Sequence, residues 1–198
     1  MKWVLAIFMG LILVPEGISA REIHVSKTGR DLASGSSGQP YLTINRAATV
    51  AQPGDTIIVH AGTYREWIKP VTGGTDETNR ITFKAATDED VFVKGSEQIE
   101  SWVHTTGGVW KATLSNSFFG QYNPYALKVS GGWLNYGQWH HRGDVYLDGE
   151  AFYEKEQLSQ VTETKNSWYC QTDKDVTTLW ANFGQANPNR ELAEINVR

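Results

Sequence analysis

The stretch from Pro53 to Tyr64 reads Pro-Gly-Asp-Thr-Ile-Ile-Val-His-Ala-Gly-Thr-Tyr, and it decides the fold of the first part of the chain. Pro53-Gly54-Asp55 has turn chemistry, because proline fixes one dihedral angle, glycine accepts a positive φ and aspartate accepts hydrogen bonds from nearby backbone. The next residues, from Thr56 to His60, are mostly β-branched and apolar, and glycine bounds them on both sides. They predict a short buried strand.

The residues upstream of this stretch predict a short helix. Ile44, Ala47, Ala48 and Ala51 follow the i, i+3, i+4, i+7 spacing of one helical face. Thr43 is a suitable N-cap, and the proline and glycine at 53–54 end the helix. A small-residue helix ahead of a buried strand is typical of a cap that covers the edge of a stack of strands.

The same pattern recurs further along. Alternating apolar residues follow at 81–85 and 91–93, and Ile81 lies 24 residues after Ile57, within the roughly 20–45 residues of one solenoid repeat. Two or three short strands per turn suit a right-handed parallel β-helix. We therefore predict that residues 21–97 form an N-terminal cap and the first coils of such a helix.

The residue pattern of the sequence changes from about residue 97, where tryptophans are scattered among short predicted strands. Asp148-Gly149 suits the type I′ turn of a hairpin that joins 144–147 to 150–154. A polar turn at 172–175 separates a second pair of strands, 168–171 and 176–182. Antiparallel hairpins favour a β-sandwich. We predict an inserted β-sandwich module at 98–192 and a truncated return strand to the β-helix at 193–198, which makes the whole fold all-β.

Residues 1–20 have the features of a secretory signal peptide. Lys2 supplies the positive charge, an apolar run of 12 residues extends from Trp3 to Val14, and small Ser19 and Ala20 suit cleavage before the next residue. The run is shorter than the roughly 17–25 residues of a membrane-spanning helix. We expect a protein secreted to the extracellular space or periplasm, with no membrane association after cleavage.

Composition narrows the choice of partners. The chain has 198 residues, a formal net charge of −4 and no basic run, so nucleic acid is not an expected partner. Cys170 is the single cysteine, which excludes an internal disulfide and favours a small buried hydrophobe. The abundance of aromatic residues is typical of core packing, and it also suits stacking on the C–H face of a sugar.

The residues give no strong metal or catalytic signature. None of the five histidines has a zinc-binding spacing, and adjacent His140 and His141 should point to different sides of a strand. Asp31 could contribute to a calcium site, but a turn cap explains it better because one carboxylate is too few. The carboxylates at 144–154 are expected to be solvated around their turn. We predict no metal, no cofactor and no catalytic residue in this chain.

Several motifs resemble known families. Val25-Ser26-Lys27-Thr28-Gly29, Thr43-Ile44-Asn45-Arg46-Ala47-Ala48 and Pro53-Gly54-Asp55-Thr56-Ile57-Ile58-Val59 resemble the opening of many secreted β-helix proteins, pectate lyases among them. More specific are Tyr64-Arg65-Glu66-Trp67-Ile68-Lys69-Pro70, Lys94-Gly95-Ser96-Glu97, Asn116-Ser117-Phe118-Phe119-Gly120, Asn123-Pro124-Tyr125, Gly143-Asp144-Val145-Tyr146-Leu147-Asp148-Gly149 and Glu194-Ile195-Asn196-Val197-Arg198. In that order they resemble the N-terminal portion of glycoside hydrolase family 120 β-xylosidases.

This resemblance implies a β-helix core with an inserted β-sandwich, and it implies retaining hydrolysis of xylo-oligosaccharides, as in xylan degradation. Such hydrolysis uses an Asp nucleophile and a Glu acid/base about 5–5.5 Å apart. The family places both carboxylates after the segment that corresponds to 194–198, so we expect the chain alone to be inactive. The family's sugar-pocket tryptophan corresponds to Trp133, which follows Gly131-Gly132, although core packing also explains it. Asn123 lies in a loop that could approach the same pocket.

Two other functions remain open. The generic opening fits a fragment of a pectate-lyase-like polysaccharide lyase, and an exposed Trp133 fits a non-catalytic sugar-binding β-helix protein. In every case the expected partner is an oligosaccharide or polysaccharide. A homo-oligomer is also expected as a possibility, because an uncovered β-helix end presents strand edges that associate.

Overall fold

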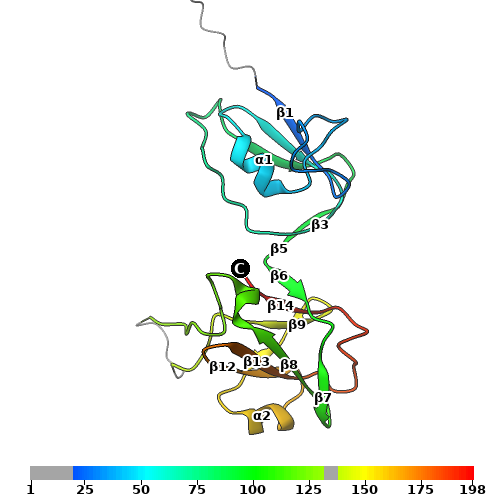
Figure 1. Cartoon of the computed structure of the whole chain (residues 1–198), viewed down its shortest axis with the longest axis vertical. Coiled ribbons are helices and arrows are strands. Elements are labelled where there is room, and N and C mark those ends of the chain that lie inside the picture. Colours follow the sequence, from blue (N-terminus) through cyan, green and yellow to red (C-terminus); the bar gives the residue numbers. More distant parts are fainter. Residues whose placement is uncertain (1–19, 132–137) are drawn as a thin grey trace, which may run out of the picture.

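The computed structural model describes residues 20–131 and 138–198 (Figure 1). The all-β prediction is confirmed in its coarse form, because short strands form four sheets within these ranges and the helices there are brief. No helix in the described ranges is long and apolar enough to cross a membrane. The predicted signal peptide lies outside the described residues, except for Ala20. We call residues 20–95 the first unit and residues 96–198 the second unit.

Two small parallel sheets make up the first unit. One has the order β1-β2-β4 and the other pairs β3 with β5. Their strands are β1 (Glu22–Val25), β2 (Thr56–Val59), β3 (Gly62–Arg65), β4 (Thr82–Ala85) and β5 (Val91–Lys94). The predicted strand at 56–60 is therefore confirmed. Both sheets are small and do not by themselves form a solenoid.

The predicted helix is α1 (Ile44–Val50), and its buried side chains pack on the first sheet. Thr43 is the N-cap as predicted, since its side-chain oxygen accepts a hydrogen bond from the Arg46 amide at 3.1 Å. The Glu66 carboxylate accepts hydrogen bonds from the amides of the first two residues of α1, Ile44 at 3.0 Å and Asn45 at 2.7 Å. The first turn of α1 therefore has partners for three of its backbone donors, which a helix N-terminus otherwise leaves unsatisfied.

The loop before α1 is anchored by Asp31. Its carboxylate accepts from the backbone amides of Leu42 at 3.0 Å and Thr43 at 2.9 Å, and from the Thr43 hydroxyl at 2.9 Å. These donors occupy the oxygens that a calcium ion would need. The structure therefore bears out the interpretation of Asp31 as a turn cap.

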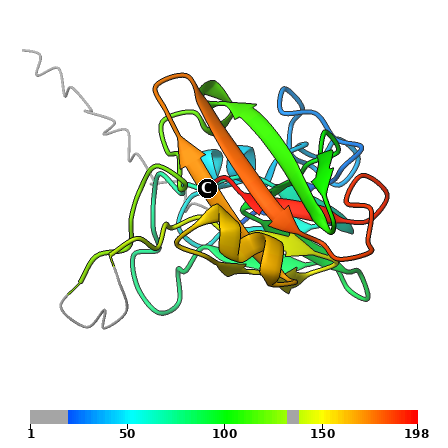
Figure 2. The same ribbon diagram turned by 90° about the horizontal axis from the view of Figure 1, so that it is seen from below.

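Two sheets form the second unit, seen from below in Figure 2, and all their strand pairs are antiparallel except that of β11 with β12. The larger has the order β11-β12-β13-β8-β7 and the smaller β10-β9-β14-β6. Their elements are β6 (Ser96–Gln98), β7 (Val103–Thr106), β8 (Val109–Ser115), β9 (Val145–Leu147), β10 (Glu150–Ala151), β11 (Tyr153–Glu154), β12 (Ser167–Thr172), β13 (Val176–Asn182) and β14 (Ala193–Asn196), with a 3-10 helix (Asn116–Phe119) and α2 (Leu158–Glu163). Both predicted hairpins are confirmed, and Asp148 and Gly149 have φ values of 51° and 87°.

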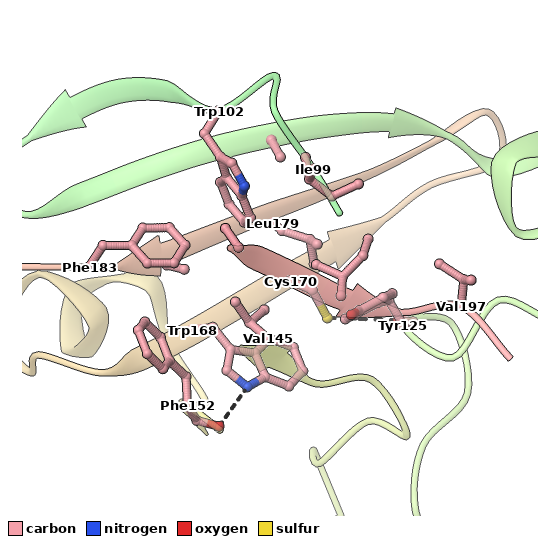
Figure 3. Close-up of a cluster of buried hydrophobic side chains, with 14 of the residues drawn as sticks. Ile99, Trp102, Tyr125, Val145, Phe152, Trp168, Cys170, Leu179, Phe183 and Val197 are labelled. Carbon is pink, nitrogen blue, oxygen red and sulfur yellow. Dashed lines mark hydrogen bonds between the residues drawn. The ribbon is translucent and has the colours of Figure 1, made fainter. Parts of the chain in front are cut away.

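The core of the second unit is rich in large aromatic side chains, Trp102, Tyr125, Phe152, Trp168 and Phe183 among them (Figure 3). Trp168 is fully buried, and its indole N–H donates to the Phe152 carbonyl at 3.2 Å, so the ring loses no hydrogen bond on burial. Cys170 is buried beside it, and burial raises the pKa of its thiol to about 12. The predicted burial of Cys170 is confirmed.

The last strand differs from its expected place. Sequence analysis assigned 193–198 to the first unit as a return strand, yet β14 lies between β9 and β6 and pairs antiparallel with both. The physical reason is that Ala193 and Ile195 belong to the core of the second unit, where they are fully buried. The other domain boundaries stay predictions.

Asp55 gives the first testable prediction. Its side chain is fully buried and accepts from the Arg21 guanidinium at 2.6 Å and the Gln52 amide at 2.8 Å. Burial alone would raise the pKa of Asp55, but these hydrogen bonds hold it below its ordinary value. A lowered pKa in the folded state adds stability that is present above the unfolded pKa of about 3.9 and is lost as pH falls through the folded pKa.

We therefore expect Asp55→Asn to lower the free energy of unfolding by about 1–3 kcal/mol at neutral pH, the cost of leaving buried donors poorly paired. The difference from wild type should shrink as the pH falls below about 4. Denaturant melts across a pH series measure both. Asp90→Asn, an exposed carboxylate in the same unit, is the matched control. A pH-independent difference would contradict the assignment.

Candidate functional site at the junction of the two units

The chain passes between the two units at Gly95, which joins β5 to β6, and β14 lies against the same place (Figure 1). A side chain at residue 95 would not fit, because a Cβ there would lie 2.5 Å from the backbone oxygen of Arg198. The Gly95 carbonyl accepts from the Val197 amide at 2.9 Å. Close backbone approach at this glycine therefore ties the end of the chain to the crossing point.

Glu194 is the central charged residue of this junction. It projects from β14 with a side chain only 3% exposed. One carboxylate oxygen lies 2.6 Å from Arg65 Nη1, and the other lies 2.7 Å from Lys94 Nζ. Burial alone would raise the pKa of Glu194, but hydrogen bonds from Lys94, Arg65 and Ser96 hold it below its ordinary value. Glu194 is therefore ionised and held by cations from β3 and β5.

A second ion pair, between Arg198 and Glu97, lies beside the first. The Arg198 guanidinium also donates to the Arg65 carbonyl at 2.8 Å. The two clusters therefore share Arg65, whose side chain contacts Glu194 and whose backbone contacts Arg198. Together they form a charge network that spans the last residues of β3, β5 and the chain end.

A cavity of about 500 Å³ opens at this network. Tyr146 contributes a phenol whose O–H donates to the Asp144 carboxylate at 3.2 Å. Burial raises the pKa of Asp144, and burial together with Asp144 raises the pKa of Tyr146 to about 12. The lining residues are Lys94, Gly95, Ser96, Tyr146, Gly149, Glu194, Asn196 and Arg198.

Trp67 provides an apolar surface near this cavity. Its side chain is 53% exposed, and it lines a smaller cavity of about 230 Å³ that shares Gly95 and Arg198 with the larger one. The Lys69 ammonium lies 4.4 Å from the ring centroid, and the Tyr122 ring meets the indole edge-on at 6.3 Å. Because Tyr122 belongs to the second unit, the indole is positioned by both units.

The chemistry of the junction suits a neutral, hydroxyl-bearing ligand. Its ammonium, guanidinium and phenol groups donate hydrogen bonds, its carboxylate accepts them, and an exposed indole offers an apolar face. Lys94 and Arg198 disfavour a bound metal cation. Glu194 is the one carboxylate among the lining residues of the larger cavity, and its lowered pKa is the reverse of what a general acid needs. The junction can hold a ligand but lacks a catalytic carboxylate pair.

Of the two residues singled out from the sequence, Asn123 is not among the lining residues of this cavity. Asn123 donates from Nδ2 to the Thr177 hydroxyl at 2.8 Å and accepts at Oδ1 from the Tyr125 amide at 3.0 Å. Both ends of its amide therefore bind other parts of the second unit, and a role in sugar binding stays a prediction. Trp133 lies outside the described residues.

Sequence analysis missed Trp67, Arg65 and Glu194 as site residues. All three stand in the quoted motifs, but nothing local marks them as neighbours because Arg65 and Glu194 are far apart in the sequence. For Arg65 and Glu194, the one available signal was their charge. A charged residue inside an alternating apolar strand requires a partner when it is buried. Their partners follow only from the pairing of β14 with β6.

Comparisons with known proteins match both units. A sequence model of the family described as "Glycoside hydrolase 120, insertion domain" matches residues 99–167 and 157–195. A second, described as "Protein of unknown function (DUF1565)", matches residues 27–71. The uncharacterized protein YwoF of Bacillus subtilis (strain 168) is 33% identical over 73 residues, which is 37% of this chain and 15% of YwoF.

Among solved structures, the complex of XylC with xylose is similar over 89% of this chain, with a TM-score of 0.85 and 45% identity. The matched region is 32% of the XylC chain, so the present chain spans about a third of that protein. The match to the insertion-domain family and the similarity to XylC cover the second unit and most of the first. The chain therefore belongs to the glycoside hydrolase 120 family and carries the insertion domain of that family.

Proposed function

We propose that this chain is the N-terminal part of a secreted β-xylosidase-like glycoside hydrolase that acts on xylo-oligosaccharides with retention of configuration. The observation that carries the proposal is the 45% identity with XylC, a protein solved with xylose, across 89% of this chain. Because the chain spans 32% of XylC, the activity is proposed for a longer protein of which these residues are a part.

The parallel sheets support the finer fold of the proposal, a right-handed β-helix. Thr56 of β2 pairs with Thr82 of β4, and Gly62 of β3 pairs with Val91 of β5, both in parallel. Each turn of the chain therefore adds one strand to each of the two sheets. The outer edges of β4 and β5 have no neighbouring strand among the described residues. Phe83, Phe92 and Val93 there are 40%, 56% and 52% exposed. An apolar ladder edge of this kind is a surface on which a further coil stacks.

The second unit supports the proposed β-sandwich. Its two mainly antiparallel sheets contribute side chains to one shared core, with Leu179 from the larger sheet and Val145 and Ile195 from the smaller. This is the arrangement in which each sheet buries one face against the other. The family match to an insertion domain covers the same residues.

We place the catalytic carboxylates outside residues 1–198. A retaining hydrolase needs a nucleophile and an acid/base about 5–5.5 Å apart, with the acid kept protonated by its surroundings. Glu194 is held ionised by Lys94 and Arg65. Asp144 has a raised pKa, but it supports Tyr146 and is not one of the groups that line the junction cavity. In this proposal the chain supplies sugar contacts while later coils supply the acids.

A non-catalytic sugar-binding role is the second candidate, and one observation favours it. The exposed Trp67 indole beside a cavity rich in hydrogen-bond donors combines the stacking face and the polar groups that sugars require. No comparable feature of the described residues favours a polysaccharide lyase, because the oxygens of Asp31, which could have contributed to a calcium site, accept hydrogen bonds from backbone and hydroxyl donors.

The first test of the proposed function is turnover of an aryl β-xyloside. We expect the 198-residue chain to release no aryl alcohol, and the longer protein to release it with the β-anomer of xylose as the first product by NMR. Clear turnover by the 198-residue chain would contradict the placement of the acids. First formation of the α-anomer by the longer protein would contradict retention.

The second test concerns Trp67. We expect Trp67→Ala to weaken binding of xylotriose about fivefold to tenfold, since the loss of about 1–1.4 kcal/mol of stacking gives a ratio of that size. Trp67→Phe should retain most of the affinity because it keeps an apolar face. Calorimetric titration measures each constant. Tyr153→Ala removes another exposed aromatic ring, 77% exposed on β11, and is the control. Equal affinity for Trp67→Ala and the control would exclude Trp67 from the sugar site.

A further inference from the structure

Three potential metal ligands meet in the second unit, away from the junction cavity. They are His141, which lies just before β9, Glu154 on β11 and Cys170 on β12. One ligand atom from each lies within 4.8 Å of the other two. All three come from separate segments, so their meeting is a property of the fold and not of local sequence. No part of the proposed glycosidase function uses them.

The ligand atoms are close to each other and shielded from solvent. His141 Nδ1 lies 2.6 Å from Glu154 Oε1 and 3.4 Å from Cys170 Sγ. The side chains of His141 and Glu154 are 18% and 6% exposed, and Cys170 is buried. A single ring nitrogen therefore faces both a carboxylate and a sulfur atom in a largely dry environment.

His140 approaches the same carboxylate from the more exposed side. Its Nδ1 lies 3.5 Å from Glu154 Oε2, and its side chain is 32% exposed. The expectation that His140 and His141 point to different sides of a strand is wrong. These residues lie in a loop with one isolated bridge, between Lys128 and His141, so strand alternation does not apply to them.

The spacing fits a tetrahedral zinc site. With Zn–N of about 2.0–2.1 Å and Zn–S of about 2.3 Å, the nitrogen and sulfur ligands stand about 3.5 Å apart, and the observed separation is 3.4 Å. A nitrogen and an oxygen ligand would stand about 3.3 Å apart, so the hydrogen bond between His141 and Glu154 would open by several tenths of an ångström. Imidazole, carboxylate and thiolate are all zinc ligands, whereas calcium and magnesium prefer oxygen alone.

A further contact resembles the outer shell of a metal site. Glu154 Oε2 accepts a hydrogen bond from the His141 backbone amide at 2.7 Å, which fixes the carboxylate and leaves Oε1 directed at His141 Nδ1. Contacts of this kind orient ligands in zinc proteins. We propose that His141, Glu154 and Cys170 bind one zinc ion, with a water molecule in the fourth position.

The proposed zinc site would hold three segments of the insertion domain together. Residues 128–129 and 140–141 pair through their backbones, and the Val129 amide donates to the His140 carbonyl at 2.7 Å. A zinc ion on His141 would connect this pair to β11 and β12, so the second unit should melt at a higher temperature with zinc than without.

The experiment uses untagged protein freed of metal with a chelator. Zn²⁺ is titrated by calorimetry, and Co²⁺ is added separately as a spectroscopic probe. We expect one Zn²⁺ per chain, a higher Tm with zinc, and a thiolate-to-cobalt charge-transfer band in the near ultraviolet. Ca²⁺ should give neither heat nor stabilisation. Absence of zinc binding, or cobalt binding without the thiolate band, would overturn the proposal without affecting the proposed glycosidase function.

Variants assign the ligands. Cys170→Ser should abolish the charge-transfer band, and both Cys170→Ser and Glu154→Gln should weaken zinc binding about tenfold or more. Glu150→Gln and His104→Gln change an exposed carboxylate and an exposed imidazole, and they should bind zinc as wild type does. Circular dichroism identifies a variant that does not fold. If a variant does not fold, the presence or absence of the thiolate-to-cobalt band in the wild-type protein decides whether Cys170 is a ligand. Wild-type affinity in folded Cys170→Ser would contradict the site.

Discussion

The ion pairs of Glu194 are the interaction on which the arrangement of the two units depends. A carboxylate with a 3% exposed side chain is costly unless cations and hydrogen bonds compensate it. Here one cation comes from β3 and the other from β5, while Glu194 itself comes from β14. The first unit therefore neutralises a charge that the second unit buries. Removing either cation would leave the carboxylate with only one of its two cationic partners, which is costly as long as Glu194 stays out of water.

A cavity lies at this junction, and residues of the charge network line it. Trp67 lines the smaller cavity beside this larger one. The ring of Tyr122, from the second unit, meets the Trp67 indole edge-on. A ligand at this place would contact both units, which is a common position for binding sites in proteins built of two parts.

Local chemistry predicted much of the fold. Thr43 as an N-cap, the strand at 56–59, and the turn at Asp148-Gly149 all follow from properties of the residues themselves. The site could not be predicted in this way. Glu194 and Arg65 meet only because β14 pairs with β6, and the hydrophobic periodicity of the sequence does not predict that pairing. His141, Glu154 and Cys170 likewise converge from three segments that are separated in the sequence, so no short motif marks them.

The position of β14 shows why such long-range contacts decide function here. Alternation at 193–197 predicts a strand but leaves its partners open, and the core decides between them: Ala193 and Ile195 fill the second unit, which turns Glu194 toward the first. Successive side chains of a strand point to opposite faces. The same two-residue period that places Ile195 in the sandwich core therefore places Glu194 against Arg65 and Lys94. A shift of one residue would bury the carboxylate in the core and expose the isoleucine, so the packing of β14 fixes the register of the junction.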